Sequence, residues 1–417
     1  MFCLFPYRGK NILLHEFKSG KVIYRDYVFN LSTMEKEKCS VQEWFLTLDL
    51  PMLTNILKPR VVHLFYELAF FIAGSKEQLA YELERIDEHA ILAIDLTFEK
   101  NDLIPADVLS GIFSEVKPKI ETLKHPNFKL YQKSFNKVLE KIKLGHIYQA
   151  NLTMPFEFKF CFDSKNDQQH VNESGLTKSQ KMKKLWAIYA HFLFPKKSIG
   201  AYGMLTAIPQ LQKAYFSNSP ECLFDWNENE RELVSRPIKG TIKHAHKENT
   251  KQVKLKLIRD KKIESELFMI SDLILNDLSK VDRPNAFIKN KKVFLQVPKL
   301  LHLYSKLAVK INPQTSLKKV LSVLFPGGSI TGAPKLQSMR VLKKIENRER
   351  GFYCGSTLLM FNKLKSASIN IRSAEIDLET FFVRYQAGGG IVMKSRANNE
   401  FVESLNKTKS FTECFKS

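Results

Sequence analysis

The sequence has 417 residues, a formal net charge of +22, 44% hydrophobic residues and 26% charged residues. The hydrophobic and charged contents are ordinary for a globular protein, and the length leaves room for two or three domains. The six cysteines form no CxxC pair, which argues against a disulfide framework or a zinc site and fits a reducing compartment. The longest apolar run, 61–74, contains His63 and Glu67 and is too short for a membrane span. The N-terminus lacks the basic region of a signal peptide, so we expect a cytoplasmic protein without a membrane partner.

The excess positive charge comes mostly from lysines spread along the whole chain. A groove for single-stranded nucleic acid interleaves basic and aromatic residues, and the sequence does not follow that pattern. We expect solvated basic faces and no nucleic-acid partner, with a basic nucleic-acid-binding protein as the alternative from another class. Attraction of an acidic substrate also explains such a charge.

Short β-like runs and one amphipathic helical segment, 76–90, fill the first 120 residues, which carry no chemical motif. A helix over about 131–144, ended by Gly145, precedes the alternating strand "IYQANLT". Residues 162–183 are polar and predict a flexible insertion. We expect an N-terminal α+β subdomain over residues 1–125 and a catalytic domain over residues 126–417.

From residue 184 onward, helices and strands alternate without a βαβ rhythm. Helices are expected near 248–278, 316–323 and 398–413, and most of the remaining segments have hairpin-like strand patterns. This arrangement predicts an α+β fold in which large antiparallel β-sheets pack as a sandwich flanked by helices.

The most glycine-rich turn is "FPGGSITGAPK" (325–335). Gly327 and Gly332 have the spacing of a phosphate-binding P-loop, but an Ala-Pro-Lys sequence ending at Lys335 replaces the required Lys-Ser/Thr. A nucleotide loop is therefore disfavoured. Pro334 suits a first helical turn, so a tight turn that brings a helix N-terminus to an anionic site is the better interpretation.

Acidic side chains near the C-terminus form a second candidate site. Glu400 and Glu403 are three residues apart on a predicted helix, and Lys407 follows on the same side. Taken alone, this pattern is more typical of a solvated face than of a metal site. Together with Glu266 they would offer oxygen ligands that suit Mg²⁺, although no spacing joins Glu266 to Glu403. The glycines at 388–390 either expose backbone N–H groups to a carboxylate or bend a strand.

Histidines and an arginine add further candidates. His302 lies between leucines, as a core histidine does, whereas His244 and His246 are isolated from other ligand types. Tyr353 and Arg372 lie in strand-like segments. An arginine there suits bidentate carboxylate binding, and a surface ion pair is the commoner alternative.

Ten ordered segments together resemble the chorismate-binding enzymes, which include the large components of anthranilate and aminodeoxychorismate synthases and the isochorismate and salicylate synthases. The segments are "GHIYQANLT", "SPE", "SRPIKGT", "ELFMISDLILNDL", "LLHLYS", "FPGGSITGAPK", "RGFYCGS", "NIRSA", "AGGGIV" and "EFVESLNK". Their order and spacing agree over about 130–410. The resemblance implies chorismate as substrate, Mg²⁺ as cofactor and a chorismate-binding fold. It also implies ammonia from a separate glutamine amidotransferase subunit, because no glutaminase segment is recognisable.

Two positions distinguish the activities within this family. Water-adding members carry a lysine base where this chain has Gln149, which disfavours isochorismate or salicylate formation. Anthranilate synthases read Pro-Ile-Ala-Gly-Thr where this chain reads "PIKGT", the form seen in aminodeoxychorismate synthase component I. By this resemblance Lys239 is a covalent nucleophile, and a lysine must be uncharged to attack. In a regular strand Lys239 would lie opposite Ile238 and Arg236.

The resemblance also implies roles for the remaining residues. Glu266 and Glu403 resemble direct Mg²⁺ ligands, with Glu400 in the outer coordination sphere. His302 matches a histidine beside the leaving hydroxyl, where a general acid helps departure. The substrate-binding set is Gly240, Thr241, Thr331, Tyr353, Arg372, Gly388, Gly389, Gly390 and Lys407.

The chain departs from the family pattern at two positions. Ile263 stands where an acidic residue is usual, and Leu275 replaces an expected arginine. The tryptophan-pocket signature is not recognisable in the N-terminal segment. Anthranilate synthase component I, disfavoured by Lys239, and a member that has lost catalysis therefore stay as alternatives.

Overall fold

The computed structural model describes residues 1–7, 10–72, 79, 82–105, 117–163, 176–193, 201–243, 250–282, 286–297 and 300–415. The strands are β1 Phe2–Tyr7, β2 Lys10–Ile23, β3 Tyr27–Asn30, β4 Lys36–Lys38, β5 Ile56–Leu64, β6 Ala93–Pro105, β7 Lys117–Lys124, β8 Gln149–Asp163, β9 Tyr202–Ile208, β10 Lys213–Ser219, β11 Cys222–Asn227, β12 Glu232–Ser235, β13 Ile238–Lys243, β14 Phe287–Val297, β15 Leu300–Lys310, β16 Gly332–Ala333, β17 Ser356–Asn362, β18 Leu364–Ile369, β19 Ser373–Asp377 and β20 Phe382–Ile391. The helices are α1 Val41–Leu46, α2 Ala69–Ile72, α5 Phe128–Lys143, α6 Lys178–Leu193, α7 Thr250–Arg259, α8 Lys261–Ser279, α9 Leu317–Leu324, α10 Gly328–Thr331, α11 Lys335–Glu346 and α12 Ala397–Thr412.

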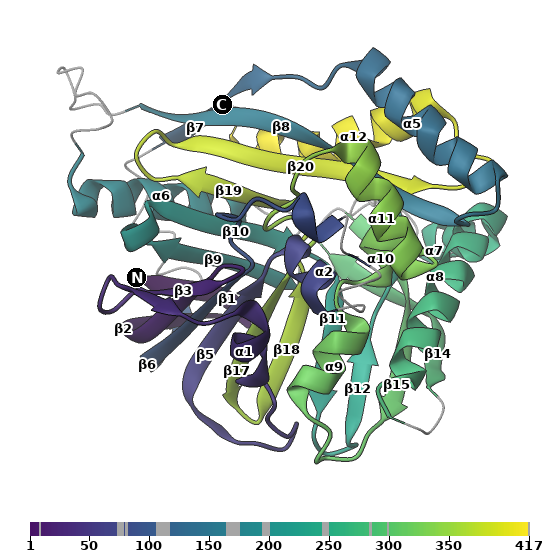
Figure 1. The fold of residues 1–417 in the computed structure, drawn as a ribbon. Coiled ribbons are helices and arrows are strands. Elements are labelled where there is room, and N and C mark those ends of the chain that lie inside the picture. The colour runs from purple at the N-terminus through teal and green to yellow at the C-terminus, as the bar shows by residue number, and fades with distance from the viewer. Residues whose placement is uncertain are drawn as a thin grey trace.

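The strands form one continuous sheet whose pairings are antiparallel. Its main order is β7-β8-β20-β19-β10-β9-β1-β2-β6-β5-β17-β18-β11-β12-β15-β14. In addition, β13 pairs with β15, and β16 pairs with β8. In Figure 1 the strands β8, β20 and β19 cross the upper part of the molecule, and β5, β17, β18, β11, β12 and β15 occupy the lower part. Large antiparallel sheets with flanking helices were expected from the sequence, and this fold class is confirmed.

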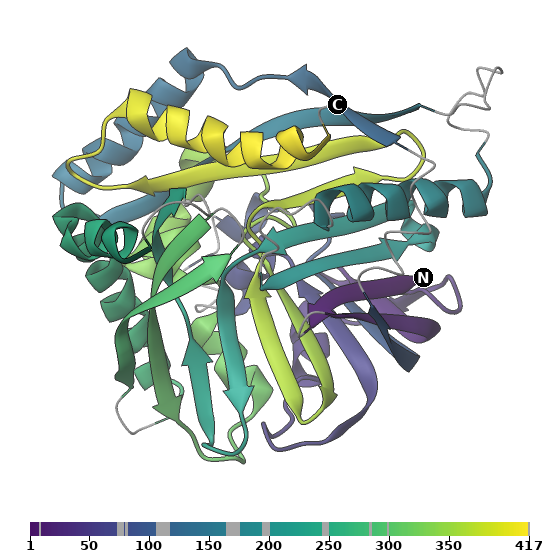
Figure 2. The same cartoon turned by 180° about the vertical axis from the view of Figure 1, so that it is seen from behind.

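Each half of the sheet has its own hydrophobic core. Trp44, Leu307 and Leu321 belong to the cluster in the half that contains β5, β15 and α9. Phe158 and Phe411 belong to the cluster between β8 or β20 and the helices α5, α6 and α12. Figure 2 shows α12 lying along β20 on the outer side of that half. The C-terminal helix therefore has a fixed position against the strand that carries the glycine run.

Helix α5 illustrates how local sequence determines an element. Its buried residues recur at helical spacing, from Tyr131 through Phe135 to Ile142, and form one apolar stripe. Asn127 caps the N-terminus by accepting from the backbone of Lys129 at 2.8 Å. Gly145, with φ of +73°, follows its end. The helix expected at 131–144 is confirmed.

The segment 248–278 differs from the helix that its sequence predicts. The single helix expected over 248–278 is two helices, α7 and α8, which meet at Asp260, whose side chain accepts from the backbone of Ile263 at 3.1 Å. An aspartate near a helix start satisfies free backbone N–H groups, so Asp260 favours the start of a new helix there.

At the insertion expected over 162–183, β8 extends to Asp163 and α6 begins at Lys178, while residues 164–175 lie outside the described ranges.

The N-terminal strands are not separated from the later ones. β1 pairs with β9, and β5 pairs with β17, where Val62 lies opposite Leu358. The division into residues 1–125 and 126–417 stays a prediction. No helix in the described ranges is long and apolar enough to cross a membrane.

Candidate functional site

A cavity of about 700 Å³ lies where β13, β15, β20, α8 and α12 come together. Among the residues that line it are Lys239, Gly240, Glu266, His302, Tyr353, Arg372, Gly388, Gly390, Glu403 and Lys407. A second space of about 150 Å³ shares Lys239, Glu266, Gly390 and Glu403 with the first and adds Glu400. Most of the residues selected from the sequence therefore meet in two adjoining cavities, although they come from segments far apart in the chain.

Lys239 lies in a β-bulge of β13. Ile238 pairs with Tyr304 and Thr241 pairs with His302, so three steps along β13 oppose two along β15. Gly240 has φ of +89°, a conformation that glycine adopts without a steric penalty. The bulge changes the direction of the strand, and both Ile238 and Lys239 line the cavity. The expectation that a regular strand places them on opposite faces is wrong at this point.

A polar network holds the chain just before the bulge. Arg236 forms an ion pair with Asp225 and donates to the hydroxyl of Tyr202 at 3.0 Å. Tyr202 and Ser366 donate to the same carboxylate at 2.7 and 2.6 Å. Because these four side chains form one hydrogen-bonded network, the position of Arg236, three residues before Lys239, is fixed.

Glu266 of α8 and Glu403 of α12 line the same cavity, a proximity that no sequence spacing predicted. Glu400 accepts from the hydroxyl of Ser395 at 2.8 Å. A Cβ on Gly389 would lie 3.2 Å from Oε2 of Glu400, so the glycine allows the helix carboxylate to approach β20 closely. The described part of the chain holds no cluster of three or more His, Cys, Asp or Glu side chains arranged for a metal. Two carboxylates with room for substrate oxygens and water fit Mg²⁺.

Lys407 connects α12 to the glycine run. Its amine donates to the carbonyl of Gly388 at 2.7 Å and forms an ion pair with Glu403 at 2.9 Å. The expected shared face of Glu400, Glu403 and Lys407 therefore points toward β20. The cation at 407 lies beside the cavity and can receive a carboxylate.

His302 is buried, and burial, followed by the charge of Arg372, lowers its pKa to about 4. The imidazole is therefore uncharged at neutral pH. A neutral imidazole can donate one hydrogen bond, but it is not an imidazolium acid.

Glu221 is a cavity residue to which the sequence analysis gave no role. It lies in the corner between β10 and β11, and only 6% of its surface is exposed. Burial raises the pKa of this carboxyl, while Lys239 and Lys407 act in the opposite direction. The "SPE" segment contained the residue, but nothing in the local sequence indicates that this acid is buried and lines the same cavity as Lys239.

Tyr353 and Arg372 reach the cavity from turns, and the expectation that they lie in strands is wrong. Gly351 and Cys354 have φ of +63° and +66°, and Arg372 itself has φ of +52°. Left-handed backbone at these positions cannot continue a strand. The turns still place both side chains against the same cavity.

The glycine-rich segment 325–335 also contributes to the cavity, through Ser329 and Ile330. Helix α11 begins directly after Pro334. Lys335 forms an ion pair with Asp277 at 2.7 Å. Thr331 is fully buried and donates to the carbonyl of Gly327 at 3.0 Å.

Other selected residues lie around this site. Ile263 lines the cavity, and a Cβ on Gly240 would lie 2.7 Å from its Cγ2 atom. Leu275 packs against the hydrophobic cluster that contains Trp44 and Leu307, so an apolar side chain contributes to packing at this position. Gln149 is buried and lines the smaller space. His244 and His246 lie outside the described residues.

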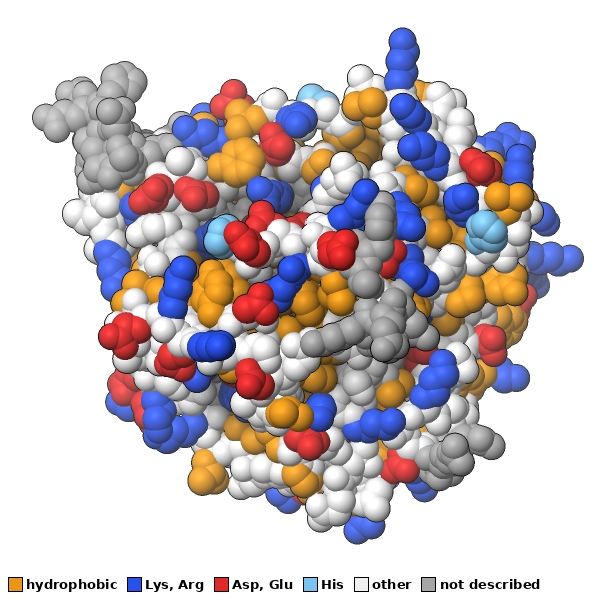
Figure 3. All heavy atoms as spheres, in the orientation of Figure 1, with side chains coloured by type: hydrophobic (Ala, Val, Ile, Leu, Met, Phe, Trp, Pro, Cys, Tyr) orange, Lys and Arg blue, Asp and Glu red, His pale blue; other side chains and the backbone are white. Residues whose placement is uncertain are grey.

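The basic surface shows no separate site on the face in Figure 3. Lys and Arg side chains are spread over it, with acidic side chains between them.

A family model described as chorismate binding enzyme matches residues 57–413. The chain belongs to this family. Aminodeoxychorismate synthase component 1 of Escherichia coli (strain K12) is 30% identical over 282 residues, which cover 66% of this chain and 55% of that protein. Anthranilate synthase component 1 of Aquifex aeolicus (strain VF5) is 31% identical over 202 residues, which cover 48% of this chain and 40% of that protein.

The crystal structure of anthranilate synthase component I from Streptococcus pneumoniae TIGR4 has the same fold. The TM-score is 0.70 at 16% sequence identity, over 96% of this chain and 91% of that chain. The family membership supports an enzymatic role. The chain spans only about half the length of the two curated relatives, and their identities are nearly equal, so the choice between their reactions depends on the site.

Proposed function

We propose that this chain is the synthase component of 4-amino-4-deoxychorismate formation, which aminates chorismate for 4-aminobenzoate and folate synthesis. The observation that carries the proposal is Lys239, an amine at a β-bulge in the cavity. By the resemblance described above, anthranilate synthases have alanine at this position. The aminodeoxychorismate synthase of Escherichia coli is among the relatives, which supports the same choice.

In the proposed reaction the amine of Lys239 attacks C2 of the chorismate ring. The ring double bond shifts, and the C4 hydroxyl leaves as water after it accepts a proton. Ammonia then attacks C4, the double bond shifts back, and the lysine nitrogen leaves C2. Ile238 and Ile263 line the same cavity as this amine, and only an uncharged amine can act as the nucleophile.

Glu221 is the proton donor that this chemistry favours. A buried carboxyl with a raised pKa retains a proton to higher pH than an exposed acid. His302 matches the family's general-acid position, but its pKa of about 4 leaves it neutral. Its role here is to donate a hydrogen bond to the departing oxygen.

Chorismate carries two carboxylates, and the cavity offers cations for both. Arg372 and Lys407 are charged donors, and Tyr353 adds a hydroxyl. Mg²⁺, when held by Glu266 and Glu403, supplies positive charge that orients a substrate carboxylate. The backbone of Gly240, Thr241, Gly388, Gly389 and Gly390 completes the proposed binding surface.

Ammonia would come from a separate glutamine amidotransferase subunit or, at high concentration, from ammonium in solution. This part of the proposal follows from the resemblance and from the component numbering in the relatives' names. Anthranilate synthase component I is the second candidate, favoured by the Aquifex aeolicus relative.

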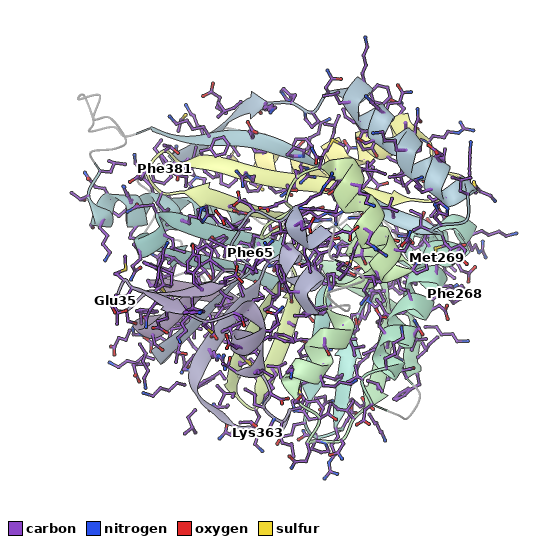
Figure 4. All side chains as sticks on the ribbon, in the orientation of Figure 1. Glu35, Phe65, Phe268, Met269, Lys363 and Phe381 are labelled. Atoms are coloured by element: carbon purple, nitrogen blue, oxygen red, sulfur yellow. The ribbon has the colours of Figure 1, made fainter. Side chains whose placement is uncertain are left out.

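The test is incubation with chorismate, Mg²⁺ and ammonium, followed by mass spectrometry of the products. The native chain should form aminodeoxychorismate, and Lys239→Ala should lower the rate by about 1,000-fold or more, equivalent to about 4 kcal/mol of barrier. Glu221→Gln should lower it by about 100-fold, as loss of a general acid does. Lys363→Ala is the matched control, because this exposed lysine lies at the far lower end of the molecule (Figure 4).

Two outcomes would contradict the proposal. Formation of 2-aminobenzoate by the native chain would identify the anthranilate reaction instead. Full activity of Lys239→Ala would exclude the covalent role of the lysine.

A further inference from the structure

The turn at 350–353 brings Tyr353 to the cavity, and two carboxylates hold its backbone. Glu67 accepts from the N–H groups of Arg350 at 2.7 Å and Gly351 at 3.0 Å, with one oxygen for each. Glu375 accepts from the N–H of Phe352 at 3.1 Å. Three successive N–H groups thus converge on carboxylates, as they do in anion-binding backbone nests.

Glu67 comes from the N-terminal third of the chain, in the short 3₁₀ turn Tyr66–Leu68. It is 2% exposed. The backbone of Tyr66 donates to the carbonyl of Gly351 at 2.9 Å, so the two turns exchange hydrogen bonds in both directions. A buried carboxylate with both oxygens occupied is a strong positional constraint.

The side chain of Arg350 extends this constraint to the rest of the cavity wall. It makes a bidentate pair with Glu346 at 2.9 Å. It also donates to the carbonyls of Ile330 at 2.9 Å and Asn151 at 2.7 Å. Its own carbonyl accepts from the Gln386 side chain at 2.6 Å. Ile330, Asn151 and Gln386 all line the cavity.

We infer that Glu67 is a positioning residue for chorismate binding: it holds the 350–353 turn so that Tyr353 meets the substrate. The inference rests on the proposed substrate and gives the N-terminal third a function in the site. Phe65, two residues before Glu67 and labelled in Figure 4, is buried, and its ring centroid lies 5.9 Å from that of Phe352. Apolar packing and the carboxylate thus hold the same turn.

Glu67→Gln is the informative substitution because it keeps the size of the side chain. The amide offers one acceptor oxygen, but its NH₂ group would face a backbone N–H donor. We expect chorismate to bind about tenfold more weakly, since a hydrogen bond to a charged group contributes about this factor. The kcat at saturating chorismate should change less than about threefold, because Lys239 and Glu221 stay in place.

Chorismate binding is measured first by calorimetry at pH 8, where Glu67, with a pKa raised by burial to about 7, is mostly a carboxylate. Mg²⁺ is present and ammonia is absent in this measurement, and KM and kcat are then measured at the same pH with ammonium. Glu88→Gln removes an equal charge at an exposed side chain in the same region, and it should bind chorismate like the native chain. Glu67→Asp keeps the charge but is one methylene shorter, and it should show a smaller loss. In the native chain, chorismate should slow hydrogen exchange in peptides covering 64–68 and 348–353, a readout that does not depend on any variant folding.

A folded Glu67→Gln variant with native affinity, or unchanged exchange in both peptides when chorismate is bound, would overturn the inference. An equal loss in kcat with no change in KM would also overturn it. If the native chain does not bind chorismate, the proposed function fails instead, and the two failures are distinguishable.

Discussion

Glu67 also makes the stability of the fold depend on pH. Burial raises the pKa of this carboxyl from 4.5 to about 7, so the folded chain retains a proton that the unfolded chain releases. Its contribution to stability is complete below pH 4.5 and is lost as pH rises through 7. This shift in the pKa of Glu67 corresponds to a change of about 3 kcal/mol in the free energy of unfolding across this pH range.

We expect the free energy of unfolding to fall more steeply between pH 5 and pH 8 in the native chain than in Glu67→Gln, which cannot titrate. Urea denaturation at several pH values measures both slopes, and the comparison cancels the titration of His63 and His302, which both chains share. Equal slopes would show that Glu67 does not titrate in this range.

Residues within compact motifs were predictable from the sequence, whereas Glu67 and Glu221 were not. Lys239, Glu403 and Lys407 lie in segments that resemble family motifs, and all three line the cavity. The importance of Glu67 depends on a turn almost 300 residues later in the chain, and that of Glu221 depends on burial. Neither property has a local sequence signal.

The bulge in β13 is the element on which the position of Lys239 depends. A Cβ at Gly240 would lie 2.7 Å from Cγ2 of Ile263 and 3.3 Å from Leu257, and φ is +89°. We expect Gly240→Ala to lower stability by about 1–3 kcal/mol and kcat by more than about tenfold, because the amine would move. Thermal melts and steady-state rates measure the two effects.

Gly145→Ala is the matched control for this substitution. Its φ of +73° imposes similar backbone strain, but no atom lies within 4 Å of the added Cβ. It should lose about 1–2 kcal/mol of stability without losing kcat. An equal loss of kcat in both variants would attribute the effect to general destabilisation.

Elements with regular periodicity were predictable, and irregular ones were not. The apolar stripe of α5 and the alternating pattern of "IYQANLT", where β8 begins, gave both elements correctly. The bulge arises from pairing with β15, some 60 residues later, and the turns at Tyr353 and Arg372 depend on left-handed backbone. Strand alternation contains no information about such pairing.

At the scale of the molecule, the N-terminal strands are central to the sheet. We expect a chain that begins at residue 126 to lose its cooperative thermal transition and its chorismate binding. β9 and β17 would lose β1 and β5 as partners and expose unpaired edges. Circular dichroism melts against the full chain test this, and a cooperative transition with native affinity would support an independent domain over 126–417.

The α+β class and its antiparallel sheet were predictable at this scale because the strand patterns lack a βαβ rhythm. The strand order was not, since β5 pairs with β17 across most of the chain. Sequence periodicity identifies strands but not their distant partners.

The central place of the first strands has a consequence during synthesis. β5 leaves the ribosome long before β17, and at about 5–20 residues per second this interval lasts on the order of tens of seconds. Throughout it, an apolar strand edge has no native neighbour. Translation speed and holding chaperones should therefore control the yield of this protein, and slower decoding of the C-terminal third should lengthen the period in which nascent chains can aggregate.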